Sequence, residues 1–335
     1  DSLKKDSFHL TAYFNPGDYY QWAEIRRGNV EEALLSEIGF RDKVFRNQSL
    51  KPGEIKILLE NILFYCENHG YPFTNVKLDS LEITKADGII GISASIHLTK
   101  NKIYLIDSII VTGSAKISEK YLHNYIYIKP KDLYDEQMIK RIAVRIKELP
   151  FLMEKHPPQM VFTENQSKLF LFLDEKKASS VNGVLGILPD AYNSGKTQII
   201  GDARLRLVNP LGKGELLDIN WRKMQTSTSD LKVIFNYPFL LNTPFGADIN
   251  FKLYKRDTTF IDINQIYGIQ YILTGGNNFK AFVGNQKSNL ISTKGYENIS
   301  ALPNFADISV TSYGIGFKAE KSDYRLNPRK GFSMD

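Results

Sequence analysis

Side chains that could carry out catalysis are scattered along this chain of 335 residues. No two of the five histidines stand at the spacing of a metal-binding pair, and the H-E-x-x-H sequence of zinc proteases is absent. The run Gly91-Ile92-Ser93-Ala94-Ser95 is not a nucleophile elbow because its last residue is not glycine. Leu211-Gly212-Lys213-Gly214 lacks the spacing of a phosphate-binding loop and indicates a hairpin turn. We therefore expect no enzyme activity, no bound metal and no cofactor.

The next candidates for a functional role are charged side chains that alternate with apolar ones. They lie between residues 181 and 321. Asp202, Arg204 and Arg206 alternate with apolar residues in one run, as Asp248 and Lys252 do in another. Such period-two alternation is typical of strands with one apolar and one polar face. Roughly seven or eight successive runs of this kind predict an antiparallel up-and-down sheet.

The length of these runs favours a membrane barrel, since roughly 9 to 14 residues are enough to cross a bilayer at a tilt. Aromatic residues stand towards the strand ends, as in an interfacial girdle: Trp221, Tyr237, Phe239, Tyr254, Phe260 and Tyr271. The charged face of such a barrel lines a wet lumen. We assign to this lumen Asp202, Arg204, Arg206, Asp248 and Lys252. A soluble sandwich with a solvated polar face is the alternative.

Composition sets wider limits. A chain of 335 residues predicts two or three domains, because single cores rarely exceed about 250–300 residues. The net charge of +6 is dispersed, so no nucleic-acid partner is expected. One cysteine, Cys66, excludes a disulfide framework and is expected to be buried on a helix. The sequence contains no run of 18 apolar residues, so no membrane helix is predicted.

The residues before the sheet predict two small α+β units, each with two helices on a sheet. The expected elements of the first unit are a strand at 8–14, helices at 30–38 and 51–68, and strands at 75–84 and 89–98. Those of the second are a strand at 103–111, helices at 117–125 and 132–149, and strands at 159–163 and 169–174. The identical order of elements indicates an internal repeat.

Several junctions resemble those of a known superfamily. Gly70-Tyr71-Pro72-Phe73, the strand–Gly113–helix opening and residues 170–174 resemble POTRA (polypeptide-transport-associated) domains. The run from Val181 to Asp190 resembles the first barrel strand of outer-membrane assembly insertases. Residues 195–215 and 323–332 are similar to later barrel segments. The resemblance covers nearly the whole chain and is nearest to Bacteroidetes-type members of the BamA/TamA-like superfamily, which combine POTRA domains with a bacterial surface antigen barrel.

This resemblance implies α+β POTRA-like repeats followed by an antiparallel transmembrane β-barrel. It places POTRA-like domains at residues 1–102 and 103–176 and the N-terminal part of the barrel at 177–335. We expect the barrel to be incomplete in this chain, because the roughly eight or nine strands recognised are fewer than the superfamily has. The late-barrel Arg-Gly-aromatic loop motif is not seen. The implied location is the outer membrane of a Gram-negative bacterium, with the POTRA domains in the periplasm.

Two strand edges are candidates for binding client proteins. The third strand of each unit is expected to pair with an extended client by β-augmentation. Its assigned residues are Ile92, Ala94, Ile96 and Leu98, and Leu169, Leu171 and Leu173. The first barrel strand is expected to pair weakly and open sideways, because glycines lack packing side chains and Pro189 cannot donate. Its assigned residues are Val181, Gly183, Val184, Leu185, Gly186 and Leu188. The alternative to client binding is that each POTRA edge is covered by a neighbour. The alternative to a weak seam is that the glycines merely ease curvature of the first barrel strand.

Together these features predict an outer-membrane insertase or translocase that needs no catalytic side chain. The resemblance implies as partners the outer-membrane lipid, including lipopolysaccharide, unfolded outer-membrane protein clients, periplasmic chaperones and accessory lipoproteins of a BAM-type complex. A two-partner-secretion pore for one passenger and a non-transporting outer-membrane scaffold remain alternatives. A charged lumen suits each of them, so composition does not separate them.

Overall fold

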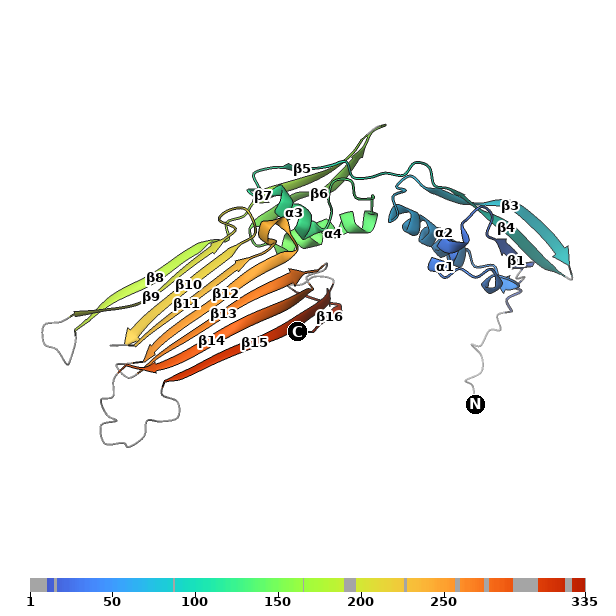
Figure 1. Ribbon diagram of the computed structural model, residues 1–335. Coiled ribbons are helices and arrows are strands. Elements are labelled where there is room, and N and C mark those ends of the chain that lie inside the picture. Colours follow the sequence, from blue (N-terminus) through green and yellow to red (C-terminus); the bar gives the residue numbers. More distant parts are fainter. Residues whose placement is uncertain are drawn as a thin grey trace, which may run out of the picture. The chain divides into compact units, whose positions relative to one another are not determined.

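The computed structural model describes residues 11–14, 17–86, 88–164, 166–189, 197–225, 228–256, 260–273, 277–291, 307–322 and 327–334. The chain forms two compact units (Figure 1). Unit 1 comprises Asp1–Leu105 with Leu133–Gln137, and unit 2 comprises Ile106–Asp132 with Met138–Asp335. No helix in the described residues is long and apolar enough to span a membrane.

Unit 1 is a four-stranded sheet with helices on one face (Figure 1). Its elements are β1 (Tyr19–Arg26), α1 (Glu32–Glu37), η1 (Asp42–Val44), β2 (Gln48–Ser49), α2 (Pro52–Glu67), β3 (Asn75–Ala86) and β4 (Ile89–Thr99). The strand order is β2-β1-β4-β3, and β1 pairs with β4 in parallel. The apolar stripe of α2 is buried against the sheet, with Ile62 and Cys66 fully inaccessible to solvent. Burial of Cys66 is thus confirmed, and burial raises the pKa of its thiol.

The expected first strand at 8–14 is wrong for its described residues, because 11–14 contain no strand. Residues 8–10 lie outside the described part of the chain. The observed first strand, β1, carries a bulge between Trp22 and Glu24, which brings both Trp22 and Ile25 into the core. Since a bulge inserts an extra residue, it breaks the period-two pattern on which strand prediction depends.

The second module belongs to unit 2 and repeats this order of elements. It consists of β5 (Ser108–Thr112), α3 (Glu119–Ile126), α4 (Glu136–Glu148), β6 (Leu152–Phe162) and β7 (Ser167–Glu175). Its sheet has the order β5-β7-β6, with β5 and β7 parallel. Ile142 and Ile146 of α4 are fully buried, as are the inward residues of β7. Both predicted helix pairs are therefore confirmed within a few residues.

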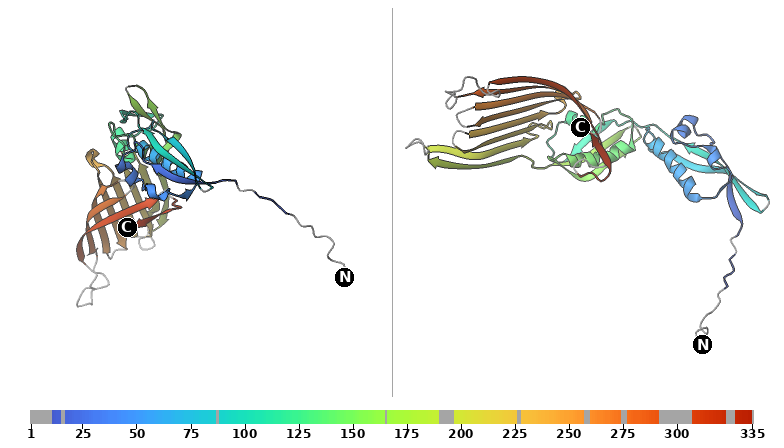
Figure 2. Two further views of the ribbon diagram at one scale, coloured as in Figure 1. Left: turned by 90° about the vertical axis from the view of Figure 1, so that its right-hand side faces the viewer. Right: turned by 90° about the horizontal axis from the view of Figure 1, so that it is seen from below.

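The large sheet of unit 2 has nine strands, and each pairs antiparallel with the next along the chain (Figures 1 and 2). They are β8 (Ser180–Pro189), β9 (Thr197–Val208), β10 (Leu216–Gln225), β11 (Thr228–Tyr237), β12 (Phe245–Arg256), β13 (Phe260–Ile272), β14 (Asn278–Leu290), β15 (Ile308–Ser322) and β16 (Gly331–Met334). A short η2 (Leu240–Asn242) lies between β11 and β12. The predicted up-and-down topology is confirmed. Among the described strands the sheet is not closed, with β8 and β16 at its two ends.

Candidate functional site

The five residues predicted to line a lumen lie on one face of the large sheet, which we call the polar face. Arg204 lies directly opposite Asn220, and Lys252 directly opposite Lys232. Residues directly opposite one another in antiparallel strands share a face. The row through Arg204 therefore crosses eight strands, as Asn182, Arg204, Asn220, Lys232, Lys252, Asn264, Gln286 and Val310. Residues two or four positions from this row, among them Asp202, Arg206 and Asp248, lie on the same face.

Ion pairs cross between strands on the polar face. Arg204 donates to Asp218 from both Nε and Nη2, at 3.1 and 2.7 Å. Arg222 Nε lies 2.8 Å from Asp202 Oδ2, and Lys280 Nζ lies 2.7 Å from Asp248 Oδ2. Each such cross-strand pair contributes roughly 0.2–1 kcal/mol. The bidentate arginine bond also fixes the register of β9 and β10, because the planar guanidinium fits the carboxylate in one orientation.

The opposite face of the sheet, which we call the apolar face, has exposed apolar side chains on β13 to β15. Tyr313 and Ile315 are 86% and 89% exposed, whereas Asp218 and Asp248 on the polar face are only 7% and 8% exposed. A soluble sheet buries its apolar face, so this distribution is that of an outward-facing membrane sheet. It follows that the chain itself supplies no cover for these apolar side chains among the described residues.

An aromatic row crosses the apolar face at the end next to the η2 turn. It consists of Phe245, Tyr271, Phe279 and Phe317. Ring centroids lie 5.1 Å apart for Phe245–Tyr271 and 4.6 Å apart for Phe279–Phe317. From Phe245 to Leu253 the apolar face of β12 spans about 27 Å at ~3.4 Å per residue, close to the apolar band of a membrane barrel.

The expected aromatic girdle is only partly correct. Trp221, Tyr237 and Tyr271 lie on the apolar face, as a girdle requires. Tyr254 and Phe260 instead lie on the polar face with Asp262. Tyr254 is directly opposite Asp262, and Phe260 precedes Asp262 by two residues on the same strand. Phe239 lies in the turn after β11, outside the sheet.

The strand predicted to be a lateral seam, β8, is an end strand of the sheet. It pairs with β9 over its full length, from Ser180 opposite Arg206 to Pro189 opposite Thr197. Val181, Val184 and Leu185 are between 71% and 75% exposed. The side chain of Leu188 lies outside the described residues. Gly183 has room for a methyl group, since the nearest atom to an added Cβ is 3.7 Å away. At Gly186 an added Cβ would lie 3.3 Å from Cγ1 of Ile200, so that side chain would have to shift slightly.

The close backbone approach between β8 and β9 is at Gly201, which the sequence did not single out. A Cβ at Gly201 would lie 2.4 Å from the carbonyl oxygen of Val184. Glycine is needed where another backbone approaches this closely. A glycine inside the alternating pattern of β9 was the available signal for a close approach. The residue spacing alone could not show that Val184 lies opposite this part of β9.

The predicted POTRA client edges are wrong, because the third strand of each module is central. β4 lies between β1 and β3, and β7 lies between β5 and β6. The side chains assigned to these edges point into the cores: Ala94, Ile96 and Leu98, and Leu169, Leu171 and Leu173 are all at most 6% exposed. Ile92 is half-buried against the core of unit 1. In both modules the last strand returns beside the first in parallel, which a helical crossover makes possible.

The long free edges are β3 in unit 1 and β6 in the second module. On β3, Leu81 and Ile83 are 63% and 71% exposed. Both strands have a register shift, β3 between Asp79 and Glu82 and β6 around His156, but only β6 contains prolines, Pro157 and Pro158. Proline lacks an N–H to donate and is a common device against edge-to-edge pairing. The β3 edge can therefore accept another strand more readily than the β6 edge.

Helix α3 contacts the hairpin turns of the large sheet, a contact that the sequence did not predict. The ring of Tyr121 packs edge-on against Phe239 at 5.6 Å between centroids. Ser118 N–H donates to the Gly212 carbonyl at 2.7 Å, and Asn209 Nδ2 donates to the Lys116 carbonyl at 3.0 Å. The Tyr127 hydroxyl also donates to the Leu273 carbonyl. Three turns of the sheet are thus held by one short helix.

The turn at 209–215 is built around a buried carboxylate. Glu215 is 2% exposed and accepts hydrogen bonds from the backbone N–H groups of Leu211 and Lys213. Burial raises the pKa of the neighbouring Tyr121, and the charge of Glu215 raises it further. Tyr121 is therefore neutral at physiological pH, as its apolar surroundings require.

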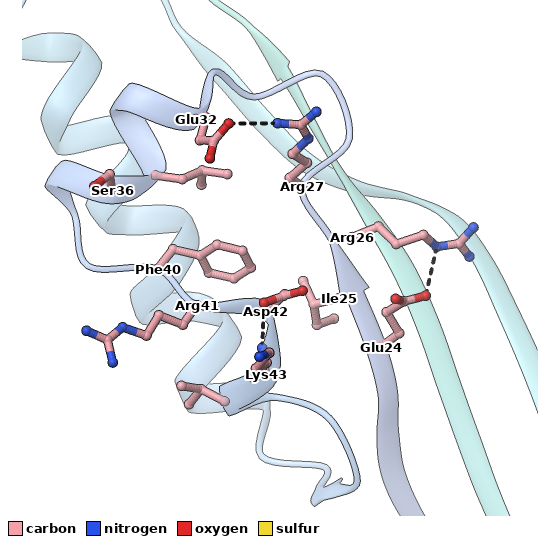
Figure 3. Close-up of a pocket in the computed structure, with 12 residues that line it drawn as sticks. Glu24, Ile25, Arg26, Arg27, Glu32, Ser36, Phe40, Arg41, Asp42 and Lys43 are labelled. Carbon is pink, nitrogen blue, oxygen red and sulfur yellow. Dashed lines mark hydrogen bonds and ion pairs between the residues drawn. The ribbon is translucent and has the colours of Figure 1, made fainter.

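An open groove of about 980 Å³ lies between β1, α1 and η1 in unit 1 (Figure 3). The ring of Phe40 points into it, and charges at its rim pair with one another, as Arg27 does with Glu32 at 3.6 Å. Nowhere in the described residues do three His, Cys, Asp or Glu side chains gather as metal ligands would. The groove is lined by four apolar residues, Ile25, Leu35, Phe40 and Val44, and otherwise by polar and charged ones.

Comparison with known proteins agrees with this architecture. Residues 104–152 match the family model "POTRA: Surface antigen variable number repeat". The match covers the second module from before β5 to the start of β6. The first module shares its element order and its parallel pairing of first and last strands. No curated protein matches the chain.

A solved structure of BamA from Haemophilus ducreyi lacking POTRA domains 1–3 matches 94% of the chain with a TM-score of 0.54 at 16% identity. The chain spans 62% of the length of that structure. CdiB from Acinetobacter baumannii and CdiB from Escherichia coli also match, each with a TM-score of 0.49, at 11% and 14% identity over 96% and 94% of the chain and 62% and 58% of their own. The match to the BamA structure shows that the chain has a BamA-like fold, which is the fold that the resemblance implied. The Bacteroidetes-type assignment stays a prediction.

Proposed function

We propose that the chain is part of an outer-membrane insertase or translocase of a Gram-negative bacterium, with its POTRA-like modules in the periplasm. The single observation that supports this proposal is an up-and-down sheet of BamA-like fold that begins at β8 and has exposed apolar side chains on one face. If the seam beside β8 opened, the outer N–H and C=O groups of this strand would face lipid, where unpaired backbone groups are costly. An incoming client strand would satisfy them without any catalytic side chain.

Client strands would first bind the modules in the periplasm. The β3 edge replaces the central strands β4 and β7 as the proposed docking site, because it is long, exposed and free of proline. β-Augmentation there would use main-chain hydrogen bonds, which demand little of the client sequence. The polar face, with Asp202, Arg204, Arg206, Asp248 and Lys252, would line the aqueous lumen. The proposed boundaries remain 1–102, 103–176 and 177–335.

A disulfide lock tests the seam. One cysteine replaces Val184 on β8, and a second is placed on the strand that faces β8 when the barrel is closed. We expect the oxidised lock to abolish insertion of clients and the reduced form to restore it. Val181→Cys with Leu205→Cys is the matched control, because it joins β8 to its existing partner β9 and leaves the free edge open. Normal insertion with the β8 edge locked would contradict the proposal.

A further inference from the structure

Charges are sorted between the two faces of the large sheet. Within the described residues of β8 to β15, every Asp and Glu lies on the polar face, as the register shows for Asp202, Asp218, Asp230, Asp248, Asp262 and Glu320. The charged residues of the apolar face are lysines alone: Lys223, Lys255, Lys287 and Lys321. Three of them, Lys223, Lys255 and Lys287, lie at the end of the sheet away from the η2 turn.

Around Lys287 the apolar face turns polar over three neighbouring strands. Asn285 lies directly opposite Gln265 on β13 and Thr311 on β15, and Lys287 lies directly opposite Ser309. Directly opposed side chains have Cβ atoms about 4.5–5.5 Å apart. We call this surface the Lys287 patch: Gln265, Asn285, Lys287, Asn289, Ser309 and Thr311. Gln265 and Asn285 are half-buried and the other four are exposed.

The same rows are apolar on the strands before β13. The row of Gln265 and Asn285 continues as Phe251, Val233, Ile219 and Leu205. The row of Lys287 and Ser309 is already apolar on β13 and continues as Ile263, Leu253, Leu231, Trp221 and Ala203. Polar groups facing lipid tails are costly unless something hydrogen-bonds to them. The Lys287 patch therefore requires a polar partner where its neighbours meet hydrocarbon.

We propose that the Lys287 patch binds the sugar-phosphate headgroup of an anionic glycolipid in the outer leaflet, with Lys223 and Lys255 extending the contact. The inference rests on the proposed membrane location and adds a lipid-binding surface to it. Lysine supplies a positive charge for phosphate, and within the described residues of β8 to β15 no carboxylate lies on this face. Asp307, just before β15, accepts a hydrogen bond from the Leu290 backbone N–H at 2.9 Å. Amides and hydroxyls supply donors and acceptors for sugar hydroxyls and phosphate oxygens. Long lysine stems allow the ammonium groups to reach the headgroup level.

The test reconstitutes the full-length protein, with its barrel complete, in phosphatidylcholine nanodiscs that also contain one of three lipids. These are bisphosphorylated lipid A, fully dephosphorylated lipid A and phosphatidylglycerol. Native mass spectrometry then measures the lipid retained by the protein. We expect preferential retention of bisphosphorylated lipid A over the other two, and a loss of about five-fold in retention for Lys287→Gln. Lys252→Gln, which removes the same charge from the polar face, is expected to retain lipid A as the unmodified chain does.

Other outcomes separate the two proposals. Equal retention of dephosphorylated lipid A or of phosphatidylglycerol would overturn recognition of a sugar-phosphate headgroup. Unchanged retention of lipid A in a double variant with Lys287→Gln and Asn285→Leu would overturn the assignment to this patch. In both cases the membrane location would stand, because the protein would still be found in the discs. A chain that does not enter the discs would overturn the membrane location and the lipid site together.

Discussion

The ring of Tyr121 occupies the space that a side chain at residue 214 would need. A Cβ at Gly214 would lie 2.2–2.5 Å from ring atoms of Tyr121, and the φ of Gly214 is +75°. Both the close approach and the left-handed backbone demand glycine. The two residues are far apart in the sequence, so no local pattern could reveal that one fits against the other.

Gly214→Ala is predicted to destabilise the attachment of α3 to the turns by roughly 1–3 kcal/mol, through steric overlap and backbone strain. The measurement is the free energy of unfolding of the second module from urea titration of the full chain. Gly212→Ala is the control, because its φ is +76° but the nearest atom to an added Cβ is 3.4 Å away. If Gly214→Ala and Gly212→Ala lower the free energy of unfolding equally, steric overlap with Tyr121 contributes nothing beyond the strain of the left-handed backbone.

Asp174 makes the second module sensitive to acid. Its carboxylate lies 2.7 Å from Lys155 Nζ and accepts two hydrogen bonds from Ser114, and these partners lower its pKa to about 2. A lowered folded-state pKa stabilises the fold fully above the unfolded pKa of about 3.9, and the contribution is lost as the pH falls towards 2. We expect the unfolding midpoint of the module to fall over this window.

Asp174→Asn is predicted to flatten that pH dependence, since an amide cannot titrate. The midpoint of urea unfolding measured at several values between pH 5 and pH 2 checks this. Glu175→Gln removes a neighbouring carboxylate outside the Lys155–Asp174–Ser114 cluster and should leave the slope unchanged. A slope that survives in Asp174→Asn would show that other carboxylates carry the acid sensitivity.

Strands and helices were predicted where their pattern is local. The alternation of Asp202, Arg204 and Arg206 with apolar residues was sufficient to predict β9 and its polar face, because a strand repeats every two residues. The edge strands were not predictable in the same way. Parallel pairing of β1 with β4 joins segments separated by two helices, and only the folded chain shows that it places Ala94 and Ile96 in the core.

The exposed β3 strand is predicted to contact client strands directly. A photo-crosslinking amino acid at Ile83 should capture unfolded barrel precursors in cells, because its side chain is 71% exposed on a strand with one free edge. The same group at Met153 on β6, which is 50% exposed, is the control. We expect little capture there, since Pro157 and Pro158 interrupt the edge. Stronger capture at Met153 than at Ile83 would contradict the choice of β3.

At the scale of the whole molecule, the chain joins POTRA-like modules to an open sheet with an exposed apolar face. Among the described strands, β3 is a long outer strand of unit 1 and β8 is the first strand of the large sheet. In the proposed function both strands would act through backbone hydrogen bonds, which need no catalytic side chain. The nature of the clients was not predictable, because backbone pairing carries little information about the partner's side chains.

Depletion of the protein in its native cell, followed by quantitative proteomics of the outer membrane, tests the central claim most directly. An insertase acts on many clients, so we predict that β-barrel proteins fall broadly while lipoproteins of the same membrane stay constant. Loss of a single exported protein would instead indicate a secretion pore. An unchanged outer membrane would indicate a scaffold, and either result would contradict the account.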